Sequence, residues 1–154
     1  MRLTTFTDYS LRVLIFVAVH PDARATIGET ARAFAISEHH LTKVVQLLGR
    51  AGFLTNLRGR GGGFMLARDA TAINVGAVVR ATEQSVPAEC FDAKSNRCTV
   101  TPVCRLKGVL GEAVESFYAT LDRYTLADLV ANRRAIVRVM FPPRKDAPRA
   151  RSRT

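Results

Sequence analysis

All three cysteines of this 154-residue chain fall within one short stretch. Cys90, Cys98 and Cys104 form a C-x7-C-x5-C array, and an odd number of thiols cannot pair completely within one chain. The array lacks the C-x2-C pairs that are typical of structural zinc sites. It favours an iron-sulfur cluster, with zinc, a thiol switch and inert cysteines as the alternatives. A fourth ligand has to come from elsewhere.

A predicted helix start lies next to the last cysteine. Thr101-Pro102 is typical of an N-cap followed by proline at the first helical position, where proline's missing amide costs nothing. We therefore expect Cys104 in the first helical turn. The helix dipole would favour a thiolate there and would stabilise an anionic metal-sulfur centre.

The helix that follows carries a long apolar stripe. Apolar side chains recur there every three or four residues, at Leu106, Leu110, Ala113, Phe117, Leu121 and Tyr124. Such a stripe needs cover, either from the rest of the chain or from a second copy. Because the preceding residues already form a small self-contained unit, we favour a homodimer. A short helix capped by residues 125–128 follows, so the predicted dimerisation region spans residues 102–132.

The first third of the sequence predicts three helices. Residues 7–19 are largely apolar behind a polar start, as expected of a buried helix. Thr26 and Glu29 form a capping box that opens a second helix, and Ser37 caps a third helix that stops at Gly52. Two short capped helices in succession predict a helix-turn-helix.

A glycine-rich hairpin follows the third helix. Residues 53–66 predict two strands that flank the segment from Arg58 to Gly63, which is the pattern of a wing. Arg58 and Arg60 are suited to phosphates or to the minor groove, and a solvated loop is the alternative. A further helix from about Asn74 to Thr82 completes a predicted DNA-binding region over residues 1–82. The cysteines follow in a loop over residues 83–104.

The second helix of a helix-turn-helix enters the major groove of DNA. Here its outward side chains can hydrogen-bond to bases or phosphates, and they are Ser37, Glu38, His39, His40, Thr42, Lys43 and Gln46. For His39 and His40, ordinary solvent exposure is the alternative.

The charge of the chain also favours DNA binding. A formal charge of +10 and a pI near 10.5 favour a polyanionic partner. Residues 133–154 hold many arginines and several prolines, and we expect a disordered basic tail that serves either solubility or accessory DNA contact.

The longest apolar run is far shorter than the roughly 20 residues of a membrane helix, and no targeting segment precedes it, so we expect a cytoplasmic protein. Without a phosphate loop or a G-x-S-x-G motif, we expect no enzyme.

Three stretches resemble the NsrR family of nitric-oxide-sensing repressors. They are residues 6–12, the wing at 58–63, and the segment from Cys98 to Lys107 with residues 124–129. The resemblance covers about residues 1–132. It implies a homodimer on double-stranded operator DNA, nitric oxide as effector, and a [4Fe-4S] or [2Fe-2S] cluster on Cys90, Cys98 and Cys104.

The resemblance also implies Asp8 of the partner subunit as the fourth ligand. Without it, Asp8 would be a carboxylate favourably placed in the first turn of a helix. In the related regulator IscR a histidine stands three positions after the last cysteine, where this sequence has Lys107.

The sequence therefore predicts a mainly α fold with a small β-wing, in which a winged helix-turn-helix precedes a long dimerisation helix. A small iron-sulfur electron carrier is one alternative, but it needs neither the basic wing nor the capped helices. A DNA-binding regulator that uses zinc or a thiol switch is the other.

Overall fold

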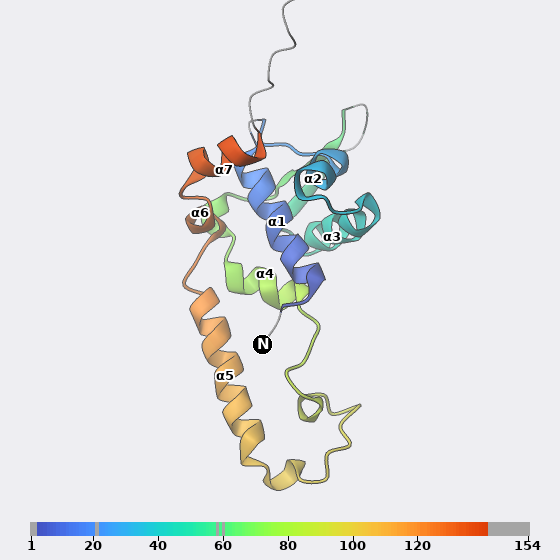
Figure 1. The fold of residues 1–154 in the computed structure, drawn as a ribbon, viewed down its shortest axis with the longest axis vertical. Coiled ribbons are helices and arrows are strands. Elements are labelled where there is room, and N and C mark those ends of the chain that lie inside the picture. Colours follow the sequence, from blue (N-terminus) through green and yellow to red (C-terminus); the bar gives the residue numbers. More distant parts are fainter. Residues whose placement is uncertain (1–2, 21, 58, 60, 142–154) are drawn as a thin grey trace, which may run out of the picture.

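The computed structural model describes residues 3–20, 22–57, 59 and 61–141. Its helices are α1 (Thr5–Val19), α2 (Ile27–Phe34), α3 (Glu38–Arg50), α4 (Val75–Thr82), α5 (Arg105–Leu121), α6 (Leu126–Leu129) and α7 (Arg133–Met140). The strands are β1 (Leu54–Leu57) and β2 (Gly63–Leu66), and short 3-10 turns lie at Ala70–Ala72, Glu89–Phe91 and Thr101–Val103. Figure 1 shows a packed body from which α5 and the preceding loop project.

Local capping sets the helix starts, as expected. Thr26 Oγ1 accepts from the amide of Glu29 at 3.2 Å, and the Glu29 carboxylate accepts from the amide of Thr26 at 2.8 Å. The side chains of Ser37 and Asn74 cap α3 and α4 by accepting from the amides of His40 and Ala77. Helix α1 begins two residues earlier than predicted, because Thr4 Oγ1 accepts from the amide of Thr7 and caps it.

Helix α1 forms the centre of the hydrophobic core. Its buried side chains contact α3, α4, α6 and β2, so the other elements surround it (Figure 1). The largest fully buried side chains come from these elements and from the turn before α4: Leu14, Phe16, Leu41, Leu48, Phe64, Ile73, Val78 and Leu126. No residue between 83 and 125 is buried. The core therefore belongs to the helix-turn-helix, the wing, α4 and α6.

The wing is a two-stranded antiparallel hairpin attached to the segment between α1 and α2. Leu54 pairs with Leu66, and Leu57 pairs with Gly63. The amides of Ala25 and Phe64 each donate to the other residue's carbonyl, at 2.9 and 2.8 Å. This extra pair fixes the root of the wing on the body.

The chain returns to the body after α5. The amide of Val75 donates to the Tyr124 carbonyl at 2.9 Å, and the amide of Leu126 donates to the Ile73 carbonyl at 2.8 Å. Residues 83–121 thus form a projection that leaves the body at the end of α4 and rejoins it before α6. We call residues 83–121 the cysteine lobe.

Helix α7 corrects one prediction. Residues 133–154 were expected to be a disordered tail, but residues 133–140 are helical. The abundance of arginine obscured an amphipathic pattern in which Ile136, Val137 and Met140 are half-buried. Residues 142–154 lie outside the described residues. Within the part of the chain that the structure describes, no helix has the length and apolar character needed to cross a bilayer.

Candidate DNA interface and cysteine site

Helix α3 separates a buried face from a polar one. Leu41, Val44, Val45 and Leu48 are buried against the body. The predicted DNA-contacting residues reach solvent: Ser37, Glu38, His39, His40, Lys43 and Gln46 are exposed, and Thr42 is half-exposed. The Ser37 hydroxyl oxygen accepts from the His40 amide at 3.3 Å, so this side chain caps the helix as well.

A cleft of about 370 Å³ separates α3 from the wing and the start of α2. Thr42 and Gln46 line it from α3, and Thr26 lines it from the N-terminus of α2. Asn56 of β1 also lines it, and the sequence analysis did not select this residue. Its signal was a polar amide in the strand that leads into the glycine-rich hairpin. Backbone amides at a helix N-terminus and neutral hydrogen-bonding side chains suit phosphate contacts.

The wing tip is braced by a basic residue that the sequence analysis also missed. Arg24 Nη1 donates to the carbonyl of Gly61 at 2.8 Å. Gly59 and Gly61 have φ values of +97° and +78°, which side chains rarely adopt, so glycine is required in this turn. Arg58 and Arg60, predicted to contact DNA, lie outside the described residues.

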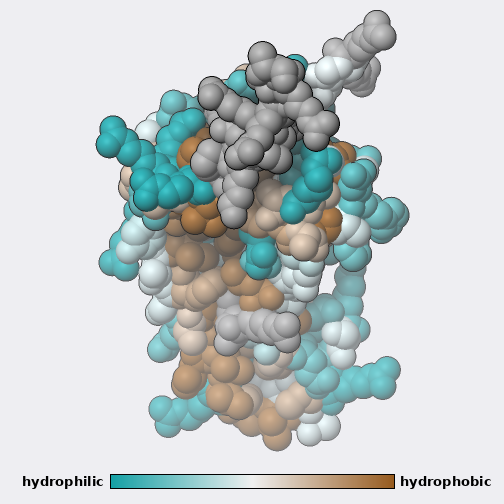
Figure 2. Space-filling model, turned by 45° about the horizontal axis from the view of Figure 1, so that its top comes forward, coloured by the Kyte–Doolittle hydropathy of each residue, from teal (hydrophilic) through white to brown (hydrophobic). Residues whose placement is uncertain are grey.

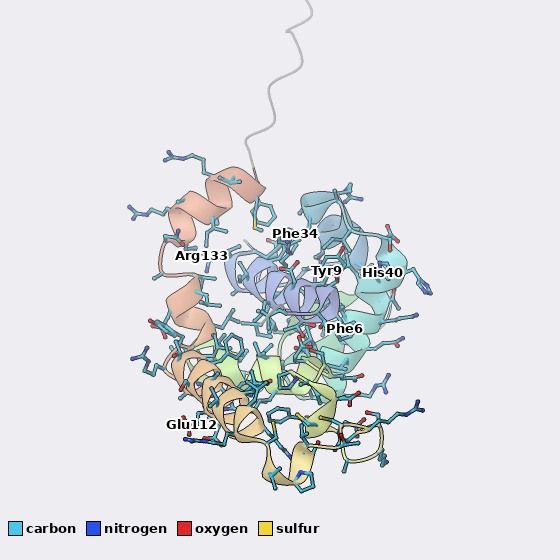
Figure 3. The ribbon with its side chains drawn as sticks, turned by 60° about the horizontal axis from the view of Figure 1, so that its bottom comes forward. Phe6, Tyr9, Phe34, His40, Glu112 and Arg133 are labelled. Carbon is cyan, nitrogen blue, oxygen red and sulfur yellow. The ribbon has the colours of Figure 1, made fainter. Side chains whose placement is uncertain are left out.

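The N-terminal turns of α1 contact the polar face of α3. Phe6 and Tyr9 line a cleft of about 350 Å³ with His40 and Lys43, and the rings of Tyr9 and His40 lie 6.4 Å apart (Figure 3). A movement of this end of α1 would therefore reach α3 directly. Asp8 lies in the same turn of α1.

The three cysteines all lie in the cysteine lobe, half-buried and free of disulfides. Cys90 lies in the 3-10 turn Glu89–Phe91, and the Cys98 amide donates to Asn96 Oδ1 at 3.1 Å. Cys104 was predicted in the first turn of the helix, but it is the N-cap residue of α5. The reason is that Thr101–Val103 forms a separate 3-10 turn before α5 begins.

Within the described residues, no three His, Cys, Asp or Glu side chains come close enough together to hold a metal ion. Asp8 belongs to the body and forms an ion pair with Arg12 at 2.8 Å, with both side chains 44% exposed. One chain therefore gathers the cysteines in one lobe without assembling a complete ligand set.

Glu83 joins the lobe to α1, and sequence reasoning did not find it. Its carboxylate accepts from the Thr4 amide at 2.8 Å, the Thr7 hydroxyl at 3.0 Å and the Ser85 amide at 3.1 Å. Burial by itself would raise the pKa of Glu83, but these hydrogen bonds outweigh it and lower the pKa to about 2. An ionised carboxylate thus ties the root of the cysteine loop to the start of α1.

A family model described as Rrf2, iron-dependent transcriptional regulator, matches residues 3–132. The chain belongs to the Rrf2 family of transcriptional regulators. It is 49% identical over 142 residues to the HTH-type transcriptional regulator NsrR of Bacillus subtilis (strain 168), covering 91% of this chain and 97% of that protein. It is also 49% identical to the NsrR of Geobacillus kaustophilus over 88% of this chain and 94% of that one. The predicted resemblance to the NsrR family is confirmed.

Solved structures of this Rrf2 regulator's relatives agree on the fold. T. potens IscR has a TM-score of 0.66 at 26% identity, covering 86% of this chain and 88% of that one. CymR, the global cysteine regulator of B. subtilis, has a TM-score of 0.64 at 27% identity, covering 86% and 98%. The predicted fold class, a mainly helical winged helix-turn-helix with a small β-wing and a following long helix, is confirmed. The relatives are transcriptional regulators and not enzymes, as predicted.

Proposed function

We propose that this Rrf2 regulator is a nitric-oxide-responsive repressor that binds operator DNA as a homodimer. Cys90, Cys98 and Cys104 would hold an iron-sulfur cluster with Asp8 of the partner subunit. The observation that carries the proposal is the collection of three free thiols in a lobe without buried residues, on a chain whose family is described as iron-dependent.

The donor set fits the cluster by its chemistry. Thiolates are the ordinary ligands of iron-sulfur clusters, and a carboxylate completes a set that three cysteines leave one short. Because the described residues of one chain do not bring three ligands together, we infer that loading rearranges the loop over residues 84–104. When bound, the cluster would supply iron that reacts with nitric oxide.

A second copy of the chain would cover α5. This helix has 17 residues and none is buried; Leu106 and Val109 are 62% and 60% exposed, and Val103 in the turn before the helix is 83% exposed. Figure 2 shows hydrophobic side chains gathered toward the lower half of the molecule, where the lobe lies. Apolar surface of this extent favours an interface. A homodimer would also bring Asp8 of one subunit to the cysteines of the other.

The DNA face would read the operator through α3. Lys43, Gln46 and their exposed neighbours would enter the major groove, while the wing with Arg58 and Arg60 would contact the minor groove or phosphates. Asp8 shares a helical turn with Phe6 and Tyr9, which line a cleft with His40. Release of Asp8 would therefore shift α1 against α3. A coupling of about 1–3 kcal/mol would change operator affinity about 5- to 150-fold.

The decisive experiment starts with anaerobic purification, visible absorbance and analysis of iron, sulfide and zinc. Nitric oxide is then titrated into loaded protein while absorbance and operator binding are followed at constant salt. We expect bleaching and release of DNA to coincide. If the absorbance bleaches while DNA affinity stays constant, the cluster has a structural role and the proposed sensing mechanism is refuted. Zinc without iron would instead support a DNA-binding regulator that uses zinc or a thiol switch.

Ligand identity is tested by single substitutions. Cys90→Ser, Cys98→Ser and Cys104→Ser should each abolish loading, because a hydroxyl is a poor ligand for iron. Thr99→Ala, at an exposed position between two of the cysteines, is the matched control and should load normally. Full iron occupancy in all three cysteine variants would refute the assignment.

A further inference from the structure

The end of α5 nearest the body is joined to α4 by a two-point ion pair. Arg80 Nη1 and Nη2 donate to Asp122 Oδ1 and Oδ2, each at 2.6 Å. The same guanidinium lies over the ring of Tyr118, 4.6 Å from the ring centre. A planar guanidinium that binds both carboxylate oxygens and lies on an aromatic ring has little freedom to rotate. Arg80 therefore holds both the last turn of α5 and the residue that caps it.

Two residues at the start of α4 also bring Asp122 close. Gly76 is buried, and a Cβ there would collide with Oδ1 of Asp122. Asn74 Nδ2 donates to the carbonyl of Asp122 at 2.7 Å. Glycine is unfavourable within a helix, and the close approach of Asp122 accounts for its presence in α4. We call Asn74, Gly76, Arg80, Tyr118 and Asp122 the α4–α5 joint.

The α4–α5 joint bears on the direction of α5. Of the described helices and strands, α4 makes the most contacts with α5, and the rest of α5 projects from the body (Figure 1). Hydrogen bonds from Arg80 lower the pKa of Asp122, so the pair stays charged at neutral pH. The two side chains are 47% and 41% exposed, and an exposed ion pair adds little to the free energy of unfolding. Its main effect is therefore on the angle at which α5 leaves the body.

Under the proposed function, this angle determines how far apart the two recognition helices lie. Helix α5 would pair with its copy in the homodimer, while α3 of each subunit would enter one half-site. The 17 residues of α5 span about 25 Å at the usual rise per residue. A tilt of about 10° at one end moves the other end by about 4 Å, close to the roughly 3.4 Å between successive base pairs. A small change at the joint would therefore change the half-site spacing that the dimer fits.

We propose that Arg80 is a positioning residue that fixes the number of base pairs between the two half-sites of the operator. The proposal rests on the proposed function, because it needs a homodimer that binds double-stranded DNA through α3. Arg80 acts through α5 and touches no DNA. One base pair more or less shifts a half-site by about 3.4 Å and turns it by about 35° around the DNA axis. A firm joint resists both changes, whereas a loosened joint adapts to them.

The test compares operators that differ only in the spacer between the half-sites. Anaerobically purified protein first selects an inverted repeat from random double-stranded DNA, and the selected duplex is then remade with one base pair added or removed. We expect the unaltered chain to bind the remade duplexes at least about 10-fold more weakly, because DNA or protein must deform to fit. Arg80→Gln should bind the selected duplex nearly as tightly as the unaltered chain, and its loss on the remade duplexes should be less than about 3-fold.

Three further variants separate the joint from charge and from folding. Asp122→Asn removes the other half of the ion pair and should broaden the spacing preference in the same way. The double variant of Arg80→Gln and Asp122→Asn should match either single one, because all three lack the same contact. Arg123→Gln makes the same change of charge at the exposed position next to Asp122 and should keep the original preference. If Arg80→Gln does not fold, Asp122→Asn decides the question.

The outcomes distinguish this proposal from the proposed function. An unchanged spacing preference in Arg80→Gln and Asp122→Asn would refute the role of the joint and leave operator binding intact. An equal loss of affinity for all three duplexes would also refute it, because Arg80 would then support folding or DNA contact. The same holds if Arg123→Gln broadens the preference, or if the unaltered chain binds all three duplexes equally. Failure of the unaltered chain to select an inverted repeat would overturn the proposed function itself.

Discussion

The body and the cysteine lobe differ in how many of their side chains are buried. The body buries side chains from α1 to α4, from the wing and from α6, and it satisfies its helix starts with caps from Thr26, Ser37 and Asn74. The lobe buries no residue, although it contains the longest helix of the described chain. Its loop is held by local contacts such as the hydrogen bond from Thr101 Oγ1 to the Cys98 carbonyl at 2.8 Å.

This difference shows which part of the molecule is complete in one chain. Burial of apolar area is the main favourable term in folding, so the body has what it needs to fold. Helix α5 has 17 residues and none is buried, so it gains less from that term. Contacts with α4 hold it to the body, and the guanidinium of Arg80 lies 4.6 Å from the ring of Tyr118. A partner subunit or a bound group would add to its stabilisation. Under the proposed function, the DNA-reading surface would thus lie on the well-packed body, and the lobe would respond to its ligands.

The largest expected effect tests whether the body carries the stability. Phe64 is 1% exposed and pairs with Ala25 at the root of the wing. Phe64→Ala should lower the free energy of unfolding by about 3–5 kcal/mol. Val109→Ala on α5 should change it by less than about 0.5 kcal/mol in dilute protein, and more at concentrations where dimers form. Urea unfolding at two protein concentrations measures both. Equal costs for the two variants at both concentrations would remove the distinction between body and lobe.

The junction between the two regions gives the next largest effect. Gly76 of α4 is buried, and a Cβ there would collide with Oδ1 of Asp122, whose carboxylate is ion-paired with Arg80 at 2.6 Å. Gly76→Ala should cost about 1–3 kcal/mol. Gly108→Ala on α5 is the matched control, because its Cβ would meet nothing within 4 Å. It should stabilise the helix by about 0.5–1 kcal/mol. A stabilising Gly76→Ala would contradict the close approach of Asp122, at the end of α5, to Gly76 of α4.

Glu83 predicts a pH dependence at the root of the lobe. Hydrogen bonds lower its pKa from 4.5 to about 2 despite the opposing effect of burial. Stability from this carboxylate is therefore complete above about pH 4.5 and is lost as the pH falls toward 2. With allowance for solvent screening, the loss should be about 1–2 kcal/mol. Glu83→Gln should remove this part of the dependence. Superimposable stability curves for the two proteins between pH 5 and about 2 would contradict it.

The sequence predicted best those features that are set by residues close together in the chain. The caps at Thr26, Ser37 and Asn74 each involve residues three positions away, so their pattern is visible in the chain. The wing followed from glycines that a tight turn requires. The polar face of α3 followed from helical periodicity.

Long-range contacts could not be predicted in this way. Glu83 bonds to Thr4 across 79 positions, and Arg133 contacts α1 across more than 110. A glutamate or an arginine in the sequence does not indicate which distant residue it will contact. Helix α7 was missed because the charge of its arginines outweighed its apolar spacing. The cysteines could be proposed as ligands from the sequence, but the described residues of one chain do not bring a complete ligand set together.

The smallest effect concerns Asp8, which belongs to the body by position and to the cysteine lobe by its proposed role. Its ion pair with Arg12 is an exposed i,i+4 contact, so Asp8→Ala and Arg12→Gln should each cost the cluster-free protein no more than about 0.5 kcal/mol. In cluster-loaded protein the two variants should differ in how fast they lose iron. Asp8→Ala should lose iron faster, whereas Arg12→Gln should not, because it leaves the carboxylate in place. Mixed dimers with Asp8→Ala in one subunit and Cys98→Ser in the other should retain one loaded site, because both changes then fall on the same site. Two damaged sites in such a dimer would refute ligation across the interface.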